Sequence, residues 1–353
     1  MNINRLIRVR DGDALSALRQ FLAAWWRRYR LQALLAPVEV PARSTVVSQV
    51  IEDPAGLAAV NPFAPVMLNN AAATIGDYAR HYAGRRMAAL LRPCELRTLV
   101  ELRQQGRLPP EAESVIILGI DCPATFPADR YNERVQVEGV AAMTREALTY
   151  AGTGGFSPNQ FRAACQVCAW PAPRGADVTL GVIGVNPGEY LLLIAHDEAI
   201  DARLGLEAVT AGLAAEPQVA RREVAVGAVA GQRARVRANL ESTAHDGQRF
   251  GDLGHVLAWF ANCSLCGDCL DACPLYNGEL SGMLGVHGAH PPLAELVDVS
   301  RWLASCSGCG MCEAACDHGV PLMLLISSLS RQIQGTLHHT AGDPVQPLPW
   351  ASG

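Results

Sequence analysis

An α/β (α+β) domain followed by a smaller, mainly helical domain is the fold class that the sequence predicts. The chain has 353 residues, of which 50% are hydrophobic and 18% charged, enough for two folded units with their own cores. A strand-helix-strand pattern marks the first part, and two cysteine runs flanked by helical segments mark the second. A polar, glycine-containing stretch separates them. We therefore expect domains at 1–245 and 246–335, with a flexible tail at 336–353.

The clearest strand-helix-strand unit spans residues 86–120. Arg86–Arg92 is typical of a short strand, and Pro93 suits the first position of the helix that follows. That helix is expected over Cys94–Gln105 and to end at the next residue, a glycine. Val115–Ile120 is an uninterrupted apolar run, which is typical of a buried parallel strand. The unit therefore predicts a parallel sheet.

Two more helices are expected in the first domain. Ala14–Leu31 carries apolar side chains at helical spacing, a pattern typical of packing against a core. Val226–Ser242 carries Arg233, Arg235 and Arg237 at alternate positions, and we expect these arginines to lie on a solvated face.

Composition excludes several functional classes. The formal net charge is −5, which gives no electrostatic reason to expect a nucleic-acid partner. All 29 basic residues are arginine, so a Schiff-base lysine and a P-loop lysine are both excluded. No apolar run reaches the ~18 residues of a membrane span, and Met1–Asp13 lacks the features of a secretory signal. We expect a soluble, cytoplasmic protein, in which 12 cysteines favour metal or redox chemistry over disulfides.

Eight of the cysteines form two runs with the same spacing, that of bacterial 4Fe-4S ferredoxins. The runs are Cys263, Cys266, Cys269, Cys273 and Cys306, Cys309, Cys312, Cys316. In two-cluster proteins the fourth cysteine of a run ligates the other cluster, so we expect Cys316 to complete the first site and Cys273 the second. Helical patterns at Pro292–Ala304 and Val320–Ile333 favour a helical dicluster ferredoxin domain. A pair of all-thiolate zinc sites is the weaker alternative.

Four cysteines remain, which is the number that one further cluster requires: Cys94, Cys122, Cys165 and Cys168. Cys94 and Cys122 each follow the carboxyl end of a predicted strand, the edge at which open α/β sheets bind ligands. Cys94 would also lie in the first turn of a helix, where free N–H groups favour a thiolate. Spacing alone leaves two interpretations open: a third cluster, or ordinary buried thiols beside half of a zinc knuckle.

Three segments around these cysteines resemble the coenzyme F420 hydrogenase/dehydrogenase beta-subunit family, and in particular its formate dehydrogenase beta-subunit branch. They are LLRPCELRTLVEL (Leu90–Leu102), ILGIDCPATF (Ile117–Phe126) and FRAACQVCAWPAPRGADVTLGVIG (Phe161–Gly184). A proline-cysteine turn, a cysteine after the next strand and a Cys-x-x-Cys before a glycine-containing strand recur in this order in the family. The resemblance covers the chain up to the cysteine runs, with a weaker match at Arg221–Leu240.

The resemblance implies that the first domain binds FAD beside a 4Fe-4S cluster held by Cys94, Cys122, Cys165 and Cys168, giving the chain FAD and three 4Fe-4S clusters. The residues that match the family's cofactor surroundings are Asn69, Asn70, Thr125, Asn132, Asn159, Arg162, Gly181 and Gly184. Arg162 could pair with flavin phosphate or with the charge of the cluster, and its alternative is a surface position. Glycine at positions 181 and 184 is consistent with a close backbone approach to a cofactor, and the alternative is a strand kink or bulge. The sequence assigns no catalytic residue, and it lacks a Gly-x-Gly-x-x-Gly fingerprint.

By this resemblance, the chain is expected to be a flavin-dependent iron-sulfur oxidoreductase similar to a formate dehydrogenase beta subunit. It would interconvert hydride and single-electron transfer. The implied partners are a two-electron carrier and other redox subunits, similar to a formate dehydrogenase alpha subunit or to heterodisulfide reductase and hydrogenase subunits. Two alternatives stay open: a stand-alone reductase that depends on coenzyme F420, a deazaflavin, or on ferredoxin, and an electron relay without flavin.

Overall fold

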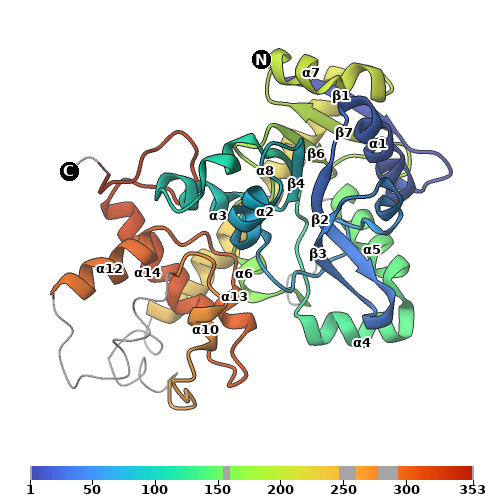
Figure 1. Ribbon diagram of the computed structural model, residues 1–353. Coiled ribbons are helices and arrows are strands. Elements are labelled where there is room, and N and C mark those ends of the chain that lie inside the picture. Colours follow the sequence, from blue (N-terminus) through green and yellow to red (C-terminus); the bar gives the residue numbers. More distant parts are fainter. Residues whose placement is uncertain (1, 154–159, 246–259, 277–292, 352–353) are drawn as a thin grey trace.

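The structure of the protein is a computed structural model, and it describes residues 2–153, 160–245, 260–276 and 293–351 (Figure 1). Within these ranges the chain forms one mixed seven-stranded sheet with helices on both faces, which confirms the predicted α/β class for the first part. No helix in the described part of the chain combines the length and the hydrophobicity that a membrane span needs.

The sheet has the strand order β1-β7-β6-β5-β4-β2-β3. Its strands are β1 (Ile3–Arg8), β2 (Ala33–Val40), β3 (Thr45–Ile51), β4 (Met87–Leu91), β5 (Ile116–Ile120), β6 (Val178–Gly181) and β7 (Tyr190–Ala195). The four central strands β2, β4, β5 and β6 are parallel, whereas β3, β7 and β1 pair antiparallel at the edges. Because parallel strands are covered on both faces, β4 and β5 are buried at every position.

Helices cover both faces of this sheet. They are α1 (Ala14–Tyr29), α2 (Ile75–His81), α3 (Pro93–Gln104), α4 (Ala128–Glu138), α5 (Val140–Thr153), α6 (Ala163–Gln166), α7 (Glu198–Leu204) and α8 (Glu216–His245). Short 3-10 helices lie between them: η1 (Pro41–Arg43), η2 (Pro54–Ala59), η3 (Ala71–Thr74), η4 (Pro110–Ser114) and η6 (Leu206–Val209). The predicted helix at 14–31 and the predicted unit at 86–120 are both present.

Alternation along β4 divides the core into two layers. Ala88 and Leu90 face the layer of α1, which includes the fully buried Trp25 and also Leu148 of α5. Met87, Ala89 and Leu91 face the opposite layer, formed by α2 and α3. The sheet is therefore held from both sides, and the carboxyl ends of its central strands have a fixed position.

The carboxyl-terminal part is helical in its described ranges. Its helices are α10 (Asp268–Asp271), α12 (Leu293–Ala304), α13 (Met311–Ala314) and α14 (Leu322–Thr336), and Figure 1 shows them below α3. Side chains from α3 and the residues after it bind this part: Arg97 donates to the Ser307 carbonyl at 2.7 Å, and Gln105 to the Ser305 hydroxyl at 2.9 Å. These contacts fix the helical part against the end of the α/β part.

The segment after α14 differs from the flexible tail that the sequence predicted. His339 and Ala341 are buried, and the Gly342 N–H donates to the buried Glu101 carboxylate at 2.7 Å. The Gln104 side chain donates to two further carbonyls of the segment. Residues 338–351 therefore pack along α3, because the polar side chains of that helix satisfy their backbone groups.

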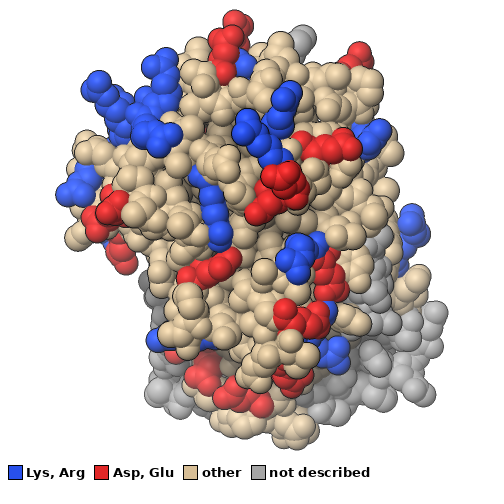
Figure 2. Space-filling view, turned by 90° about the vertical axis from the view of Figure 1, so that its right-hand side faces the viewer, with Lys and Arg blue, Asp and Glu red and all other residues tan. Residues whose placement is uncertain are grey.

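Charged side chains are mixed on the face seen in Figure 2. Arginines gather toward its upper left, and acidic and basic side chains are interspersed over the rest of what the view describes. Elsewhere in the described chain, charged side chains are also paired, such as Arg134 with Glu138 and Glu146.

Candidate metal centre

The four cysteines outside the two runs meet at the carboxyl ends of β4 and β5. Cys94 lies in the first turn of α3, directly after β4, and Cys122 lies two residues after β5. Cys165 belongs to α6, and Cys168 follows it. All four line one cavity, which we call the cysteine cavity, and we call the four residues the inner site. The fold therefore brings together segments that are far apart in the sequence.

The position of Cys94 is set by the start of α3. Pro93 occupies the first turn, and the Glu95 carboxylate accepts hydrogen bonds from the backbone N–H groups of Arg92 at 2.7 Å and Ala71 at 3.0 Å. Glu95 is fully buried, and burial raises the pKa of its carboxyl. This cap satisfies N–H groups that a helix start would otherwise leave unpaired.

Cys122 is held through its neighbour Asp121. The Asp121 carboxylate is buried and accepts from the N–H groups of Val182 at 3.0 Å and Ile183 at 3.2 Å. It also pairs with Arg222 of α8, whose Nε lies 2.9 Å from Oδ2. A buried ion pair with these additional bonds has every partner in place, so it fixes the loop after β5 to the long helix α8.

The Cys-x-x-Cys segment is bound to the same loop. The Arg162 N–H donates to the Thr125 carbonyl at 3.0 Å, and the Thr125 hydroxyl lies 3.3 Å from the Cys165 sulfur. The Cys122 N–H donates to the Pro171 carbonyl at 2.8 Å, beyond Cys168. These contacts on both sides of the segment hold its two sulfurs beside Cys122.

Three buried arginines surround the cysteine cavity. Arg92 donates to the Ala64 carbonyl, Arg162 to the Cys309 carbonyl at 2.9 Å, and Arg233 to the carbonyl that precedes Ala124. All three line the cavity and are at most 8% exposed. A lining that carries three arginines would attract an anionic occupant.

The burial of Arg233 corrects the expectation of a solvated face. On α8, Arg233 and Arg237 are four residues apart and so share one face, and Arg237 donates to the Val167 carbonyl at 3.5 Å. The alternate spacing of Arg233, Arg235 and Arg237 in the sequence does not show that Arg233 and Arg237 share a helix face. Arg162 is likewise buried, so its surface alternative is wrong.

Burial makes the Cys94 and Cys122 thiols weak acids. It raises the pKa of Cys94 well above its usual value, and the nearby Glu95 adds to the effect. It raises the pKa of Cys122 to about 12, although the charges of Arg92 and Arg233 act in the opposite direction. The thiolate forms therefore require a bound metal to offset their charge.

The described residues show no ready-made site for a single metal ion. In the described ranges, no three Cys, His, Asp or Glu side chains lie close enough together to hold a single ion. A zinc ion with bonds of about 2.3 Å would need sulfurs about 4 Å apart. An iron-sulfur cube separates its thiolates further, because four irons and four sulfides lie between them. The cluster that the sequence resemblance implies at these four cysteines stays a prediction.

In the helical part, the fourth cysteine of each run is a neighbour of the first three cysteines of the other run. Burial raises the pKa of Cys269, and the thiols that add to this effect are Cys316, Cys263 and Cys266. Burial also raises the pKa of Cys312, and there the neighbours are Cys309, Cys306 and Cys273. We call the first group (Cys263, Cys266, Cys269, Cys316) the outer site and the second (Cys306, Cys309, Cys312, Cys273) the middle site. The neighbours of Cys269 and of Cys312 are grouped as the predicted exchange of fourth cysteines requires, and the two ligand sets stay predictions.

The middle site borders the inner site. Cys309 lines the cysteine cavity, and its charge acts on the Cys94 thiol. Gly310 follows with a φ of +69°, and a side chain there would clash with Ala164 of α6. The glycine therefore permits the close approach of the two sites. The outer site lies beyond, where Cys266 is exposed.

The structure divides the predicted cofactor residues. Thr125 and Arg162 line the cysteine cavity. Asn70 is buried, but it caps η3 and donates to the Thr98 hydroxyl at 3.0 Å, so its polar groups are occupied within the fold. Asn69 and Asn132 are exposed, and Asn159 lies outside the described residues.

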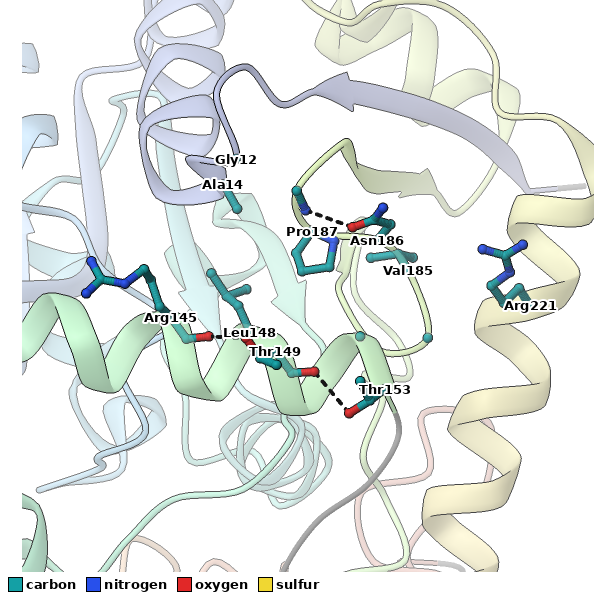
Figure 3. A pocket seen from close by; sticks show the side chains of 13 residues that line it. Gly12, Ala14, Arg145, Leu148, Thr149, Thr153, Val185, Asn186, Pro187 and Arg221 are labelled. Carbon is teal, nitrogen blue, oxygen red and sulfur yellow. Dashed lines mark hydrogen bonds between the residues drawn. The ribbon is translucent and has the colours of Figure 1, made fainter.

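The two predicted glycines are explained by α8. A Cβ at Gly181 would lie 2.7 Å from the Arg222 Nε, and one at Gly184, where φ is +70°, would clash with Ala225. The close approach that the sequence analysis attributed to a cofactor is thus the approach of a helix. Gly184 also lines a pocket of about 450 Å³ between α5 and α8 (Figure 3), whose lining residues differ from those of the cysteine cavity.

A second pocket, of about 460 Å³, adjoins the cysteine cavity and is called the α6 pocket here. Met67, Arg162 and Ala164 line both spaces. Glu313 and Asp317, from α13 and the residues after it, line its opposite side, and burial raises the pKa of Glu313. Its volume lies within the usual range of sites for small ligands.

Comparisons with known proteins give a distant likeness. No protein-family model and no curated protein matches the sequence. Among solved structures 11 chains match, and one of them belongs to the F420-reducing NiFe hydrogenase complex from Methanosarcina barkeri, in a xenon derivative. The sequences are 10% identical, the match covers 69% of this chain and 92% of that chain, and the TM-score is 0.48.

Sequence reasoning missed several residues of this centre. Arg92, Arg233 and Trp170 line the cysteine cavity, and Cys309 of the second run reaches it as well. The sequence does contain one signal of the contacts around this centre: Asp121, a charged residue directly after an apolar strand and directly before a cysteine. The others depend on which helix packs against the loops, which spacing does not reveal.

Proposed function

We propose that this chain is an iron-sulfur and flavin electron-transfer protein, with 4Fe-4S clusters at the inner, middle and outer sites. The observation that carries the proposal is the inner site: four cysteines from separate segments line one buried cavity together with Arg92, Arg162 and Arg233. A cluster with four thiolate ligands is anionic, and the arginine side chains that line the cavity would attract it.

The contacts between sites suggest an order of electron transfer. Cys309 joins the middle site to the inner site, and the exposed Cys266 lies at the outer site. We infer a route that runs between the inner site and the outer site through the middle site. Each cluster would carry one electron at a time, and a redox partner would exchange electrons at the outer site.

Under this proposal the α6 pocket would take only the uncharged isoalloxazine ring of FAD, because Asp129, Glu313 and Asp317 line it beside a single arginine and would repel the pyrophosphate. The pocket shares Arg162 with the cysteine cavity, so a ligand there would lie directly beside the inner site. Arg162 would offset negative charge of the cluster, while Met67 and Leu68 would provide apolar contact to the ring. A bound flavin exchanges two electrons as hydride and passes them on singly.

The proposed role is that of a subunit in an oxidoreductase complex, of the kind found in formate dehydrogenase beta subunits. Residues 1–245 would form the flavin unit and residues 246–335 the dicluster ferredoxin unit. The partners would be a catalytic redox subunit and a two-electron carrier. This assignment rests on the sequence motifs and not on the fold, because one fold supports many activities.

Anaerobic purification tests the proposal. The full chain should contain about twelve irons and an equal amount of sulfide, together with one FAD and no stoichiometric zinc. Co-purifying redox subunits would support its place in a complex. Twelve irons without flavin would favour an electron relay, whereas zinc in place of iron would contradict the proposal.

A further inference from the structure

We propose that Arg97 is a positioning residue whose charge raises the reduction potentials of both the inner site and the middle site. This inference rests on the proposed function, because it assumes clusters at both sites. It concerns one side chain of α3 that lies between the two sets of cysteines.

Arg97 is bound on both sides of this junction. Its helix carries Cys94 three residues earlier, and its Nη1 donates to the Ser307 carbonyl at 2.7 Å, between Cys306 and Cys309. Its Nε donates to the Ala341 carbonyl at 2.9 Å. The backbones of two separate segments therefore fix the guanidinium in one position.

The charge of Arg97 acts on thiols of both sites. Burial lowers its pKa, and the opposing charges come first from Cys168, then from Cys306 and Cys94. Its carbon Cζ lies 5.3 Å from the centre of the Trp170 ring, which also lines the cysteine cavity. The half-buried side chain thus lies between inner and middle cysteines, where water screens its charge less than it would on the surface.

The direction of the effect follows from charge. Reduction adds one negative charge to a cluster, and a fixed cation nearby stabilises the reduced form more than the oxidised form. Arginine is suited to this task because it stays protonated even when buried. One residue that faces two clusters would raise both potentials and reduce their mutual repulsion.

The experiment is a potentiometric titration of the anaerobic holoprotein, monitored by EPR, with wild type, Arg97→Gln and Arg97→Lys. In Arg97→Gln the equilibrium constant of reduction should fall about tenfold at the inner and middle sites, about 59 mV for a one-electron couple. The outer site should keep its potential and serves as an internal reference. Arg97→Lys keeps the charge and should keep all three potentials close to wild type.

Arg174→Gln is the matched control. Arg174 also packs on the Trp170 ring, with its Cζ 4.2 Å from the centre of the ring, but its side chain is exposed. Its removal should leave the potentials unchanged, because solvent screens its charge. If Arg97→Gln loses iron, Arg97→Met provides a second neutral variant that keeps the apolar stem.

The outcomes separate this inference from the proposed function. Twelve irons with unshifted potentials in the neutral variants, or equal shifts in Arg97→Lys and Arg97→Gln, would overturn the role of the charge while the clusters stand. Loss of iron in both neutral variants with retention in Arg97→Lys would support an electrostatic role. A wild-type protein without iron at the inner site would overturn both proposals.

Discussion

The inner and outer sites are built from the same number of cysteines in opposite ways. Three ligands of the outer site come from one short run, Cys263 to Cys269, whose spacing already predicts a cluster. The inner site takes its cysteines from three separate segments of the α/β part, and buried contacts such as Asp121 with Arg222 hold these segments together. A local run can define a site by spacing, whereas a dispersed site depends on the stability of the whole fold.

The largest expected effect comes from breaking the contact on which the dispersed site depends. Asp121→Ala would leave Arg222 buried without its partner, which should lower the free energy of unfolding by about 3–5 kcal/mol. The inner site should lose its iron first, since the loop of Cys122 is released. Chemical denaturation and iron analysis of the purified variant measure both effects.

Asp77→Ala is the control for this variant. Asp77 pairs with Arg80 on the surface, and its side chain is 83% exposed, so its loss should change stability little. Equal stability of Asp121→Ala and wild type would contradict the dependence of the inner site on this ion pair.

A second variant weakens the link between inner and middle sites. Thr98 donates to the Cys94 carbonyl at 3.0 Å, accepts from Asn70, and lies 2.8 Å from the Ser307 hydroxyl. Thr98→Val should cost about 1–3 kcal/mol, because it leaves buried polar groups without partners. Thr149→Val removes an exposed hydroxyl of the same type and should cost much less. Equal unfolding midpoints for the two variants would show that the link does not matter.

The variant with the smallest expected effect tests whether Cys273 belongs to the middle site or to the site of its own run. The Trp302 indole Nε1 donates to the Cys273 sulfur at 3.4 Å. Hydrogen bonds to cluster sulfurs raise reduction potentials, so Trp302→Phe should lower the potential of the middle site alone. The other two potentials in the same titration are the references. A shift at the outer site instead would assign Cys273 to its own run.

The sequence predicted the regular parts of the molecule well. The unit of β4, α3 and β5 follows from periodicity, Pro93 and the glycine at 106, all of which act within a few residues. The ligand spacing of the two runs is likewise local. These features are encoded where they occur, so they can be recognised without the fold.

The remaining features depend on contacts across the chain. The burial of Arg233 is decided by the face that α8 presents to the Cys122 loop, and the place of residues 338–351 by polar groups of α3 such as Glu101. The glycines at 181 and 184 were correctly recognised as close-approach positions, but the neighbour is a helix. Spacing carries no information about such partners.

The iron content of the Cys168→Ala variant, compared with that of Cys266→Ala at the outer site, tests the central claim most directly. The claim is that the cysteine cavity holds a complete cluster that is independent of the two runs. In anaerobic preparations, Cys168→Ala should retain about eight of roughly twelve irons and keep the EPR signals of the middle and outer sites. A Cys168→Ala protein with the same iron content and spectra as wild type would contradict a cluster at the inner site.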